Sequence, residues 1–133
     1  MNGRFTSGDL LEATYFSSVV YVNQGKGKYS KIPLPQLAQI SPINTFELMD
    51  VNHDKYPDVL IGANFYRSNI QMGRYDADFG TVLINKGKGR FMVDEKYNLS
   101  LKGELKSIKP ITRQGKKNYI LSRNNEKTLL YSF

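Results

Sequence analysis

Residues 50–58, DVNHDKYPD, gather oxygen-bearing side chains in a chain that is otherwise basic. Acidic or amide side chains occupy positions 1, 3 and 5 of this stretch, and another aspartate follows a proline at position 9. An extended strand would place the first three on one face, where the like charges repel one another. A loop coiled around a cation would instead turn their oxygens inward. The predicted ligands are the side chains of Asp50, Asn52, Asp54 and Asp58 and the main-chain carbonyl of Tyr56.

Calcium suits these donors better than magnesium. Ca²⁺ takes about six to eight oxygens at roughly 2.3–2.6 Å in irregular geometry, whereas Mg²⁺ requires a tight octahedron and retains its waters. Three carboxylates leave one negative charge against a dication, which Lys55 can offset. The alternative is an acidic turn whose Asp and Asn residues bond to the local backbone. That alternative explains one or two such residues, but not four with this spacing, so we predict a calcium loop.

The calcium loop differs from an EF-hand in its last ligand and in its flanks. An EF-hand needs a bidentate glutamate at position 12 and a helix on either side. Position 12 is Ile61 here, and the flanking sequences TFELMDV and DVLIGANF have the pattern of strands. We therefore expect the loop to join two strands of one sheet.

Short runs rich in β-branched and aromatic residues, bounded by Gly, Asn or Pro, recur along the chain and predict an all-β, antiparallel protein. The stretch NKGKGRF favours a hairpin turn, because its glycines accept positive φ angles. A phosphate-binding loop would need a longer glycine spacing and a following helix. The clearest strand candidates are Val19–Asn23, Asp58–Ala63, Thr81–Asn85 and Tyr119–Ser122.

Two stretches of the chain echo each other. VVYVNQGKGKYSK at 19–31 resembles TVLINKGKGRFMV at 81–93, which places Asn23 over Asn85. LMDVNHDKYPDVLIGANF is echoed more loosely by IKPITRQGKKNYILSRNN, with Asp50 over Ile111. A period of about 60 residues suits a four-stranded unit with generous loops.

The composition bounds the class of protein and its partners. The chain has 133 residues, no Cys and a formal charge of +7. No apolar run reaches the roughly 20 residues that span a bilayer. Most of the excess charge lies beyond residue 98, which favours either an anion-binding patch for a glycan, nucleic acid or phospholipid, or a solvated strand face. We favour the solvated face, and we do not expect nucleic acid to be the main partner.

The first residues, MNGRFTSGDLLEA, lack the pattern of a signal peptide. We expect the sequence to be a piece of a longer chain, with a targeting signal upstream. The expected location is extracellular, periplasmic or on the cell surface.

The stretch FELMDVNHDKYPDVLIGANF resembles the FG-GAP or VCBS repeat of integrin α-like β-propellers and of bacterial relatives of cartilage acidic protein. The resemblance covers roughly residues 15–133 and implies four-stranded propeller-type blades. It also implies a secreted calcium-binding module for cell adhesion, with the same five calcium ligands. Two departures are Lys55 at a usual glycine and Asn64 where proline usually follows Gly-Ala. The second repeat carries Ile111, Arg113, Gly115, Lys117 and Tyr119 at the ligand positions, so we predict a single site.

The expected organisation is about two blades that do not close into a ring. Residues 1–18 form a lead-in, 19–98 a first repeat region with the loop at 50–58, and 99–133 a degenerate second blade with a closing strand. Unpaired sheet edges could allow self-association.

The predicted function is non-enzymatic recognition of a protein or glycan ligand. The alternative is a glycan- or nucleic-acid-binding surface on the basic C-terminal repeat. A hydrolase using Asp76 and Asp78 is a third reading, although turn capping or salt bridging explains these residues better. We expect His53 to face solvent, and Tyr66 and Arg67 offer a conceivable ligand surface in a long loop.

Overall fold

The computed structural model describes residues 11–68, 71 and 73–133 and is all-β there, as predicted. The two helical turns of this part are short 3₁₀ segments, Gln36–Ala38 and Glu95–Tyr97. No helix in the described residues is long and apolar enough to cross a membrane. The strands are β1 (Val19–Gly25), β2 (Lys28–Pro33), β3 (Ile43–Met49), β4 (Asp58–Ala63), β5 (Val82–Asn85), β6 (Phe91–Val93), β7 (Leu105–Arg113), β8 (Lys116–Arg123) and β9 (Leu129–Tyr131).

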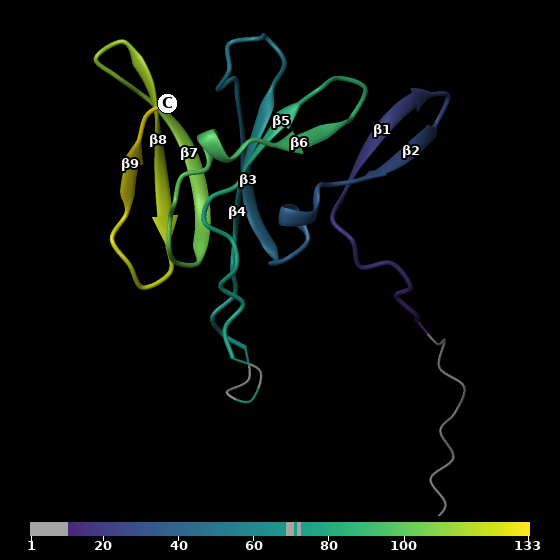
Figure 1. Ribbon diagram of the computed structural model, residues 1–133, viewed down its shortest axis with the longest axis horizontal. Coiled ribbons are helices and arrows are strands. Elements are labelled where there is room, and N and C mark those ends of the chain that lie inside the picture. The colour runs from purple at the N-terminus through teal and green to yellow at the C-terminus, as the bar shows by residue number, and fades with distance from the viewer. Residues whose placement is uncertain (1–10, 69–70, 72) are drawn as a thin grey trace, which may run out of the picture.

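The strands form three separate antiparallel sheets, and none of the three closes into a barrel. Their orders are β1-β2, β3-β4-β5-β6 and β7-β8-β9, so every strand pairs with its neighbour in the chain. Figure 1 shows the sheets side by side, with the four-stranded sheet in the centre. The predicted region 19–98 therefore contains two of the sheets.

The hairpins β1–β2 and β5–β6 share a register and a turn. Asn23 pairs with Tyr29, and Asn85 pairs with Phe91. In each turn the Asn side chain accepts the N–H of the residue two positions on, at 2.8 Å. The φ angles of the three turn residues are 80°, 51° and 73° in one hairpin and 75°, 56° and 73° in the other. The Gly-Lys-Gly sequence explains this, since glycine adopts positive φ at little cost. The hairpin turn predicted at NKGKGRF is confirmed.

The hairpins β3–β4 and β7–β8 share a bulge but not a loop. The register shifts between Ile43 and Thr45 in one hairpin and between Leu105 and Ser107 in the other. Eight residues join β3 to β4, whereas Gln114 and Gly115 alone join β7 to β8, with φ angles of 51° and 74°. Positive φ at both residues is typical of a tight hairpin turn. Among the residues expected at degenerate ligand positions, only Gly115 lies outside a strand.

The main core lies between the four-stranded sheet and the β7–β9 sheet. Leu60 of β4 and Leu121 of β8 are fully buried at its centre. A Cβ on Gly62 would come within 2.4 Å of the Leu105 side chain. The glycine in this strand therefore allows β7 to pack closely, because any side chain there would displace Leu105. The other buried core residues are Met49, Val51, Val82, Ile84, Leu99, Ile108 and Tyr119.

The opposite face of the four-stranded sheet is only partly covered. The β1–β2 hairpin packs on it near β6, where a Cβ on Gly89 would come within 2.3 Å of Val22. A second, smaller core of Ala38, Ile61 and Leu83 lies beneath. Phe46 of β3 remains 63% exposed on this face. Two strands cannot cover a sheet of four, so the β3 side stays open.

Candidate functional site

The acidic loop begins directly after β3 and ends at the first residue of β4. These two strands are neighbours in one antiparallel sheet. The expectation that the loop joins two strands of a sheet is confirmed, and the helices that an EF-hand requires are replaced by strands. The sequence produces this arrangement because β-branched and aliphatic runs precede and follow the loop.

Three side chains of the loop turn inward onto its own backbone. The carboxylate of Asp50 accepts the amide N–H of Asp54 at 3.1 Å and that of Lys55 at 3.0 Å. Asn52 Oδ1 also accepts the Asp54 N–H, and its Nδ2 donates to Asp54 Oδ2 at 2.8 Å. Asp54 Oδ1 accepts the amide of Tyr56 at 2.8 Å. Such bonds hold a loop in turn conformations and gather its oxygens on one side.

Two residues of the loop have left-handed backbone. His53 has a φ of 60° and Lys55 a φ of 70°. Lys55 occupies the position where the resemblance expects glycine. Its positive φ is the conformation that glycine adopts most easily, although the residue here is lysine. The side chain of His53 is exposed, as predicted.

Asp58 anchors the base of the loop. Its side chain is completely buried, and Oδ2 accepts the Val51 N–H at 3.0 Å while Oδ1 accepts the Asn85 N–H at 2.9 Å. The Asn85 side chain donates in turn to the Pro57 carbonyl at 3.0 Å. The Asp58 side chain therefore ties the end of the loop to its beginning at Val51 and to β5. The sequence pattern suggested a metal ligand but did not suggest this connection.

The donor types suit calcium, because all five predicted ligands present oxygen and three of them carry charge. Each carboxylate oxygen that accepts one amide keeps a second lone pair for a cation. The residues that the structure describes contain no gathering of three His, Cys, Asp or Glu side chains suited to hold a metal ion. A calcium site here would therefore depend on Asn52 and the Tyr56 carbonyl as well as on the aspartates.

Asp76 and Asp78 have separate partners. Asp78 is buried, and its carboxylate accepts the Thr81 hydroxyl at 2.7 Å and the N–H groups of Gly80 and Thr81. This is the turn-capping role expected from the sequence. Asp76 is exposed and accepts the Tyr66 hydroxyl at 2.8 Å. Burial, followed by this hydrogen bond, raises the pKa of Tyr66 to about 12.

Asn64 links three segments and was not singled out as a linking residue by the sequence pattern. It is buried with a φ of 82°. Its Oδ1 accepts the Ser41 hydroxyl and the Asp78 N–H, both at 2.9 Å. Its Nδ2 donates to the carbonyls of Asp78, at 2.7 Å, and Gly103, at 3.0 Å. The only signal in the sequence was an asparagine where the resemblance expects proline. A proline could not make these side-chain bonds.

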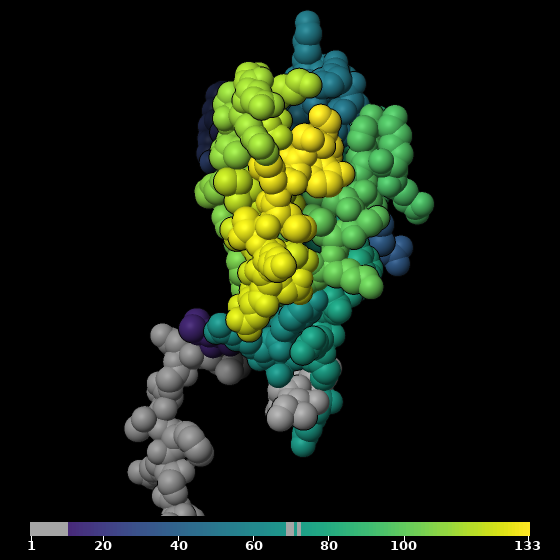
Figure 2. Space-filling view, turned by 90° about the vertical axis from the view of Figure 1, so that its left-hand side faces the viewer, coloured from purple at the N-terminus to yellow at the C-terminus, as the bar shows by residue number. Residues whose placement is uncertain are grey.

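The basic residues of β7 and β8 divide between two faces. Arg113 pairs with Lys116 and therefore shares a face with it, and Lys109 lies on the same face four residues earlier. Lys117 lies on the other face, with its ammonium 5.3 Å from the centre of the Tyr119 ring. Figure 2 views the molecule from the side of the β7–β9 sheet and shows the C-terminal segments at the front. Neighbouring lysines in the sequence thus belong to different surfaces.

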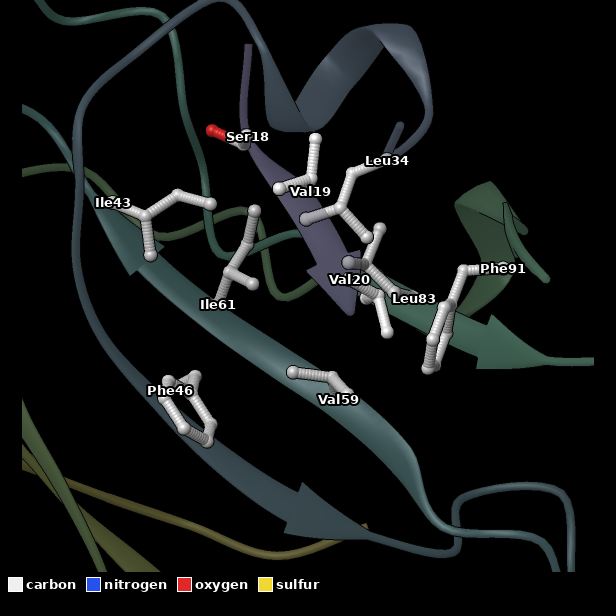
Figure 3. Close-up of a pocket in the computed structure, with 10 residues that line it drawn as sticks. All are labelled: Ser18, Val19, Val20, Leu34, Ile43, Phe46, Val59, Ile61, Leu83 and Phe91. Carbon is white, nitrogen blue, oxygen red and sulfur yellow. The ribbon is translucent and has the colours of Figure 1, made fainter. Parts of the chain in front are cut away.

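An apolar cavity of about 350 Å³ lies between β1 and the four-stranded sheet. Figure 3 shows side chains of β3 and β4 on one side of it, and Val19, Val20 and Leu34 on the other. Ser18 supplies the one polar side chain of its lining. The charged loop does not contribute to this cavity, so the molecule carries two distinct candidate sites.

The chain was compared with family models, curated proteins and solved structures, and no match was found in any of the three.

Proposed function

We propose that this chain is a non-enzymatic, calcium-stabilised recognition module built of propeller-type blades of the FG-GAP or VCBS kind. In this proposal calcium binds the loop 50–58 through Asp50, Asn52, Asp54, Asp58 and the Tyr56 carbonyl. The module would act outside the cytoplasm, in adhesion or in binding a protein or glycan ligand. Calcium would neutralise the loop carboxylates and fix the connection between β3 and β4.

One observation carries the proposal. The loop joins adjacent strands, keeps a left-handed residue at its sixth position, and holds Asp50, Asn52 and Asp54 together around one set of backbone amides. A simple acidic turn would need only one or two of these side chains. The crowding of three carboxylates in nine residues costs repulsion that a dication would relieve.

Thermal unfolding with and without calcium tests the proposal. At a free calcium concentration about 100 times Kd, linkage raises the free energy of unfolding by about 2.7 kcal/mol, and EDTA removes the gain. Asp54→Ala should abolish the response, whereas Glu12→Ala, which removes an exposed acid outside the loop, should leave it intact. Equal melting temperatures in calcium and EDTA, together with no heat of calcium binding by calorimetry, would contradict a calcium site.

A second candidate is an anion-binding surface on the β7–β8 hairpin. The face that carries Lys109, Arg113 and Lys116 favours it, because the segment 105–123 contains no acidic residue. Retention on immobilised heparin should fall steeply with salt and should be lost in the triple Gln variant of these residues. The matched control replaces three exposed lysines of the β1–β2 hairpin, Lys26, Lys28 and Lys31, by Gln. Equal loss in both variants would indicate nonspecific attraction by net charge and would remove this candidate.

A further inference from the structure

The cavity beside β1 is bounded by a free strand edge as well as by apolar side chains. β1 pairs with β2 alone, so its other edge has no strand partner among the described residues. The same cavity is lined by Phe46 and Val59, which remain partly open to solvent. It continues the interface through which Val22 and Ile32 already pack on Gly89.

The interface between the four-stranded sheet and the β7–β9 sheet shows how exposed residues at the aligned positions are when another layer packs on them. The shared bulge aligns β3 with β7 and β4 with β8, which places Phe46 at the position of Ile108 and Ile61 at that of Leu121. The four residues of the covered interface are at most 4% exposed. Of their counterparts, Phe46 is 63% exposed, Ile43 and Val59 are partly buried, and Ile61 is buried. The aligned pairs are Ile43 with Leu105, Phe46 with Ile108, Val59 with Tyr119 and Ile61 with Leu121.

In the interface with the β7–β9 sheet, the aliphatic side chains that cover the aligned residues come from two elements. β5 contributes Val82 and Ile84, and the β3–β4 hairpin with its loop contributes Met49, Val51 and Leu60. On the cavity side, β1 offers Val20 and Val22 at the positions of Val82 and Ile84, because β1–β2 has the register of β5–β6. No described residue takes the place of Met49, Val51 and Leu60. The cavity therefore lacks the aliphatic side chains that a hairpin supplies in the covered interface.

Among the described residues, Asn23 of β1 also lacks the partner that the equivalent residue of β5, Asn85, finds on the adjacent strand. The backbone N–H of Asn85 donates to Asp58, and its side chain donates to Pro57, both at the start of β4. Asn23 has the same register in its hairpin and the same bond within its turn. Its N–H and side-chain amide are therefore directed toward the position that an adjacent strand would occupy, where an acidic residue could accept from the N–H.

We infer that the cavity is an acceptor site for a β-hairpin that adds to the free edge of β1. The strand next to β1 runs antiparallel to it, begins with an acidic residue against Asn23, and directs aliphatic side chains onto Phe46 and Val59. Strand addition of this kind gains main-chain hydrogen bonds together with apolar burial. A second copy cannot supply its β3–β4 hairpin for this purpose without dismantling its own sheet, so the occupant is a hairpin of another polypeptide segment.

The test adds such a hairpin to the full chain. Residues 43–63 are fused ahead of Met1, so that residues 1–17 serve as the linker to β1. The fusion is melted in EDTA, so that calcium in the duplicated loop does not contribute, and the exchange of β1 amide hydrogens is measured alongside. We expect Tm to rise by about 5 °C or more and the β1 amides to exchange at least about tenfold more slowly.

Three controls decide the outcome. The same fusion with Ser in place of Met49, Val51 and Leu60 of the added copy should show neither effect. Asn23→Ala in the original chain should reduce the gain. Unchanged Tm and exchange in the fusion, or an equal rise in the Ser fusion, would overturn the inference. Concentration-dependent dimerisation of the unmodified chain that protects its β1 amides in sedimentation and exchange measurements would also overturn it, because a second copy would then be the occupant.

Discussion

At the scale of single residues, several positions other than glycine have a positive φ, a backbone conformation that is unfavourable for residues with a Cβ. Lys55 and Asn64 both have φ near 70–80° and serve different ends. Asn64 is buried and its side chain makes hydrogen bonds that compensate for the conformation. Lys55 is exposed, and its own side chain makes no hydrogen bond in the described structure. The bond from its amide to Asp50 is therefore the local compensation for its conformational cost.

Replacing Lys55 by Gly should stabilise the protein by about 0.5–1 kcal/mol, because glycine adopts this φ without the clash of a Cβ. Urea denaturation measures the change. Lys86→Gly is the control, since Lys86 is exposed and does not have a positive φ. It should be neutral or slightly destabilising. A stabilisation of the same size in both variants would mean that the loss of charge, and not the backbone, is responsible.

Asn64→Ala should cost about 3 kcal/mol or more, because it leaves buried partners on three segments without hydrogen bonds. Asn125→Ala is the matched control, since Asn125 also has a positive φ, of 55°, but is exposed. The control should cost no more than about 1 kcal/mol. Similar losses in the two variants would show that the left-handed backbone alone is responsible.

At the scale of elements, the sequence predicted the strands better than their connections. Asp58–Ala63 matches β4 at both ends, and Val19–Asn23 falls two residues short of the end of β1. Alternation and β-branched runs are local signals, which is why they sufficed. The echo that placed Asp50 over Ile111 suggested a degenerate loop at 111–119, but the structure has a two-residue turn there. A weak similarity between two stretches can align their strands without revealing that the loop between the strands is shorter in one of them.

For the candidate site, residue types were predictable and long-range partners were not. The alternation in 50–58 predicted oxygens turned inward around a cation, which stays a prediction. The structure shows Asp50, Asn52 and Asp54 bonded to nearby amides, as the alternative of an acidic turn also predicts. The bond from Asn85 to Asp58 spans 27 residues. No local pattern encodes such a partner, which depends on β4 and β5 lying side by side.

The connection before β7 holds a buried acid. The Glu104 side chain forms an ion pair with Lys106 and accepts from Asn124 at 2.7 Å. Burial alone would raise the pKa of Glu104, but the hydrogen bonds from Lys106 and Asn124 outweigh it and hold the pKa below the ordinary value of 4.5. A lowered pKa means that the folded state binds this proton less readily than the unfolded state. Its stabilisation is therefore present above pH 4.5 and is lost as the pH falls through the folded-state pKa.

Glu104→Gln should destabilise the protein by about 2 kcal/mol at pH 7, since hydrogen bonds to a charged group are lost. The difference from the parent chain should shrink below pH 4.5 as the parent loses its own contribution. Denaturation curves between pH 3 and pH 7 measure it. A deficit that is constant across this range would assign the role of Glu104 to packing.

At the scale of the whole molecule, the two faces of the central sheet differ in how completely they are covered. Phe46 and Ile108 occupy aligned positions in neighbouring sheets, yet one is 63% exposed and the other 1%. The contribution of an apolar side chain depends on the area it buries, so equivalent positions should respond unequally to the same change.

Ile108→Ser should cost about 3 kcal/mol or more through a cavity and a buried hydroxyl, whereas Phe46→Ser should cost less than about 1 kcal/mol. Chemical denaturation of the two variants measures the contrast. Equal losses would mean that Phe46 is covered in solution, which would place a partner on this face already.

Every strand in the described part of the chain pairs with a strand next to it in sequence, so no crossover connection has to form between these strands. The hairpins β1–β2, β5–β6 and β7–β8 should therefore form by short-range closures of the kind that an isolated hairpin completes in about 1–10 μs. The packing of the sheets on one another joins strands far apart in the chain, such as β3 and β7, so this step loses more loop entropy and should follow the closure of the hairpins. During synthesis, each hairpin can close as soon as its second strand leaves the ribosome. The tight hairpins should accordingly close early in refolding from denaturant, and the pairing of β4 with β5 across residues 64–81, a longer connection than the eight-residue acidic one, should be the slowest strand pairing.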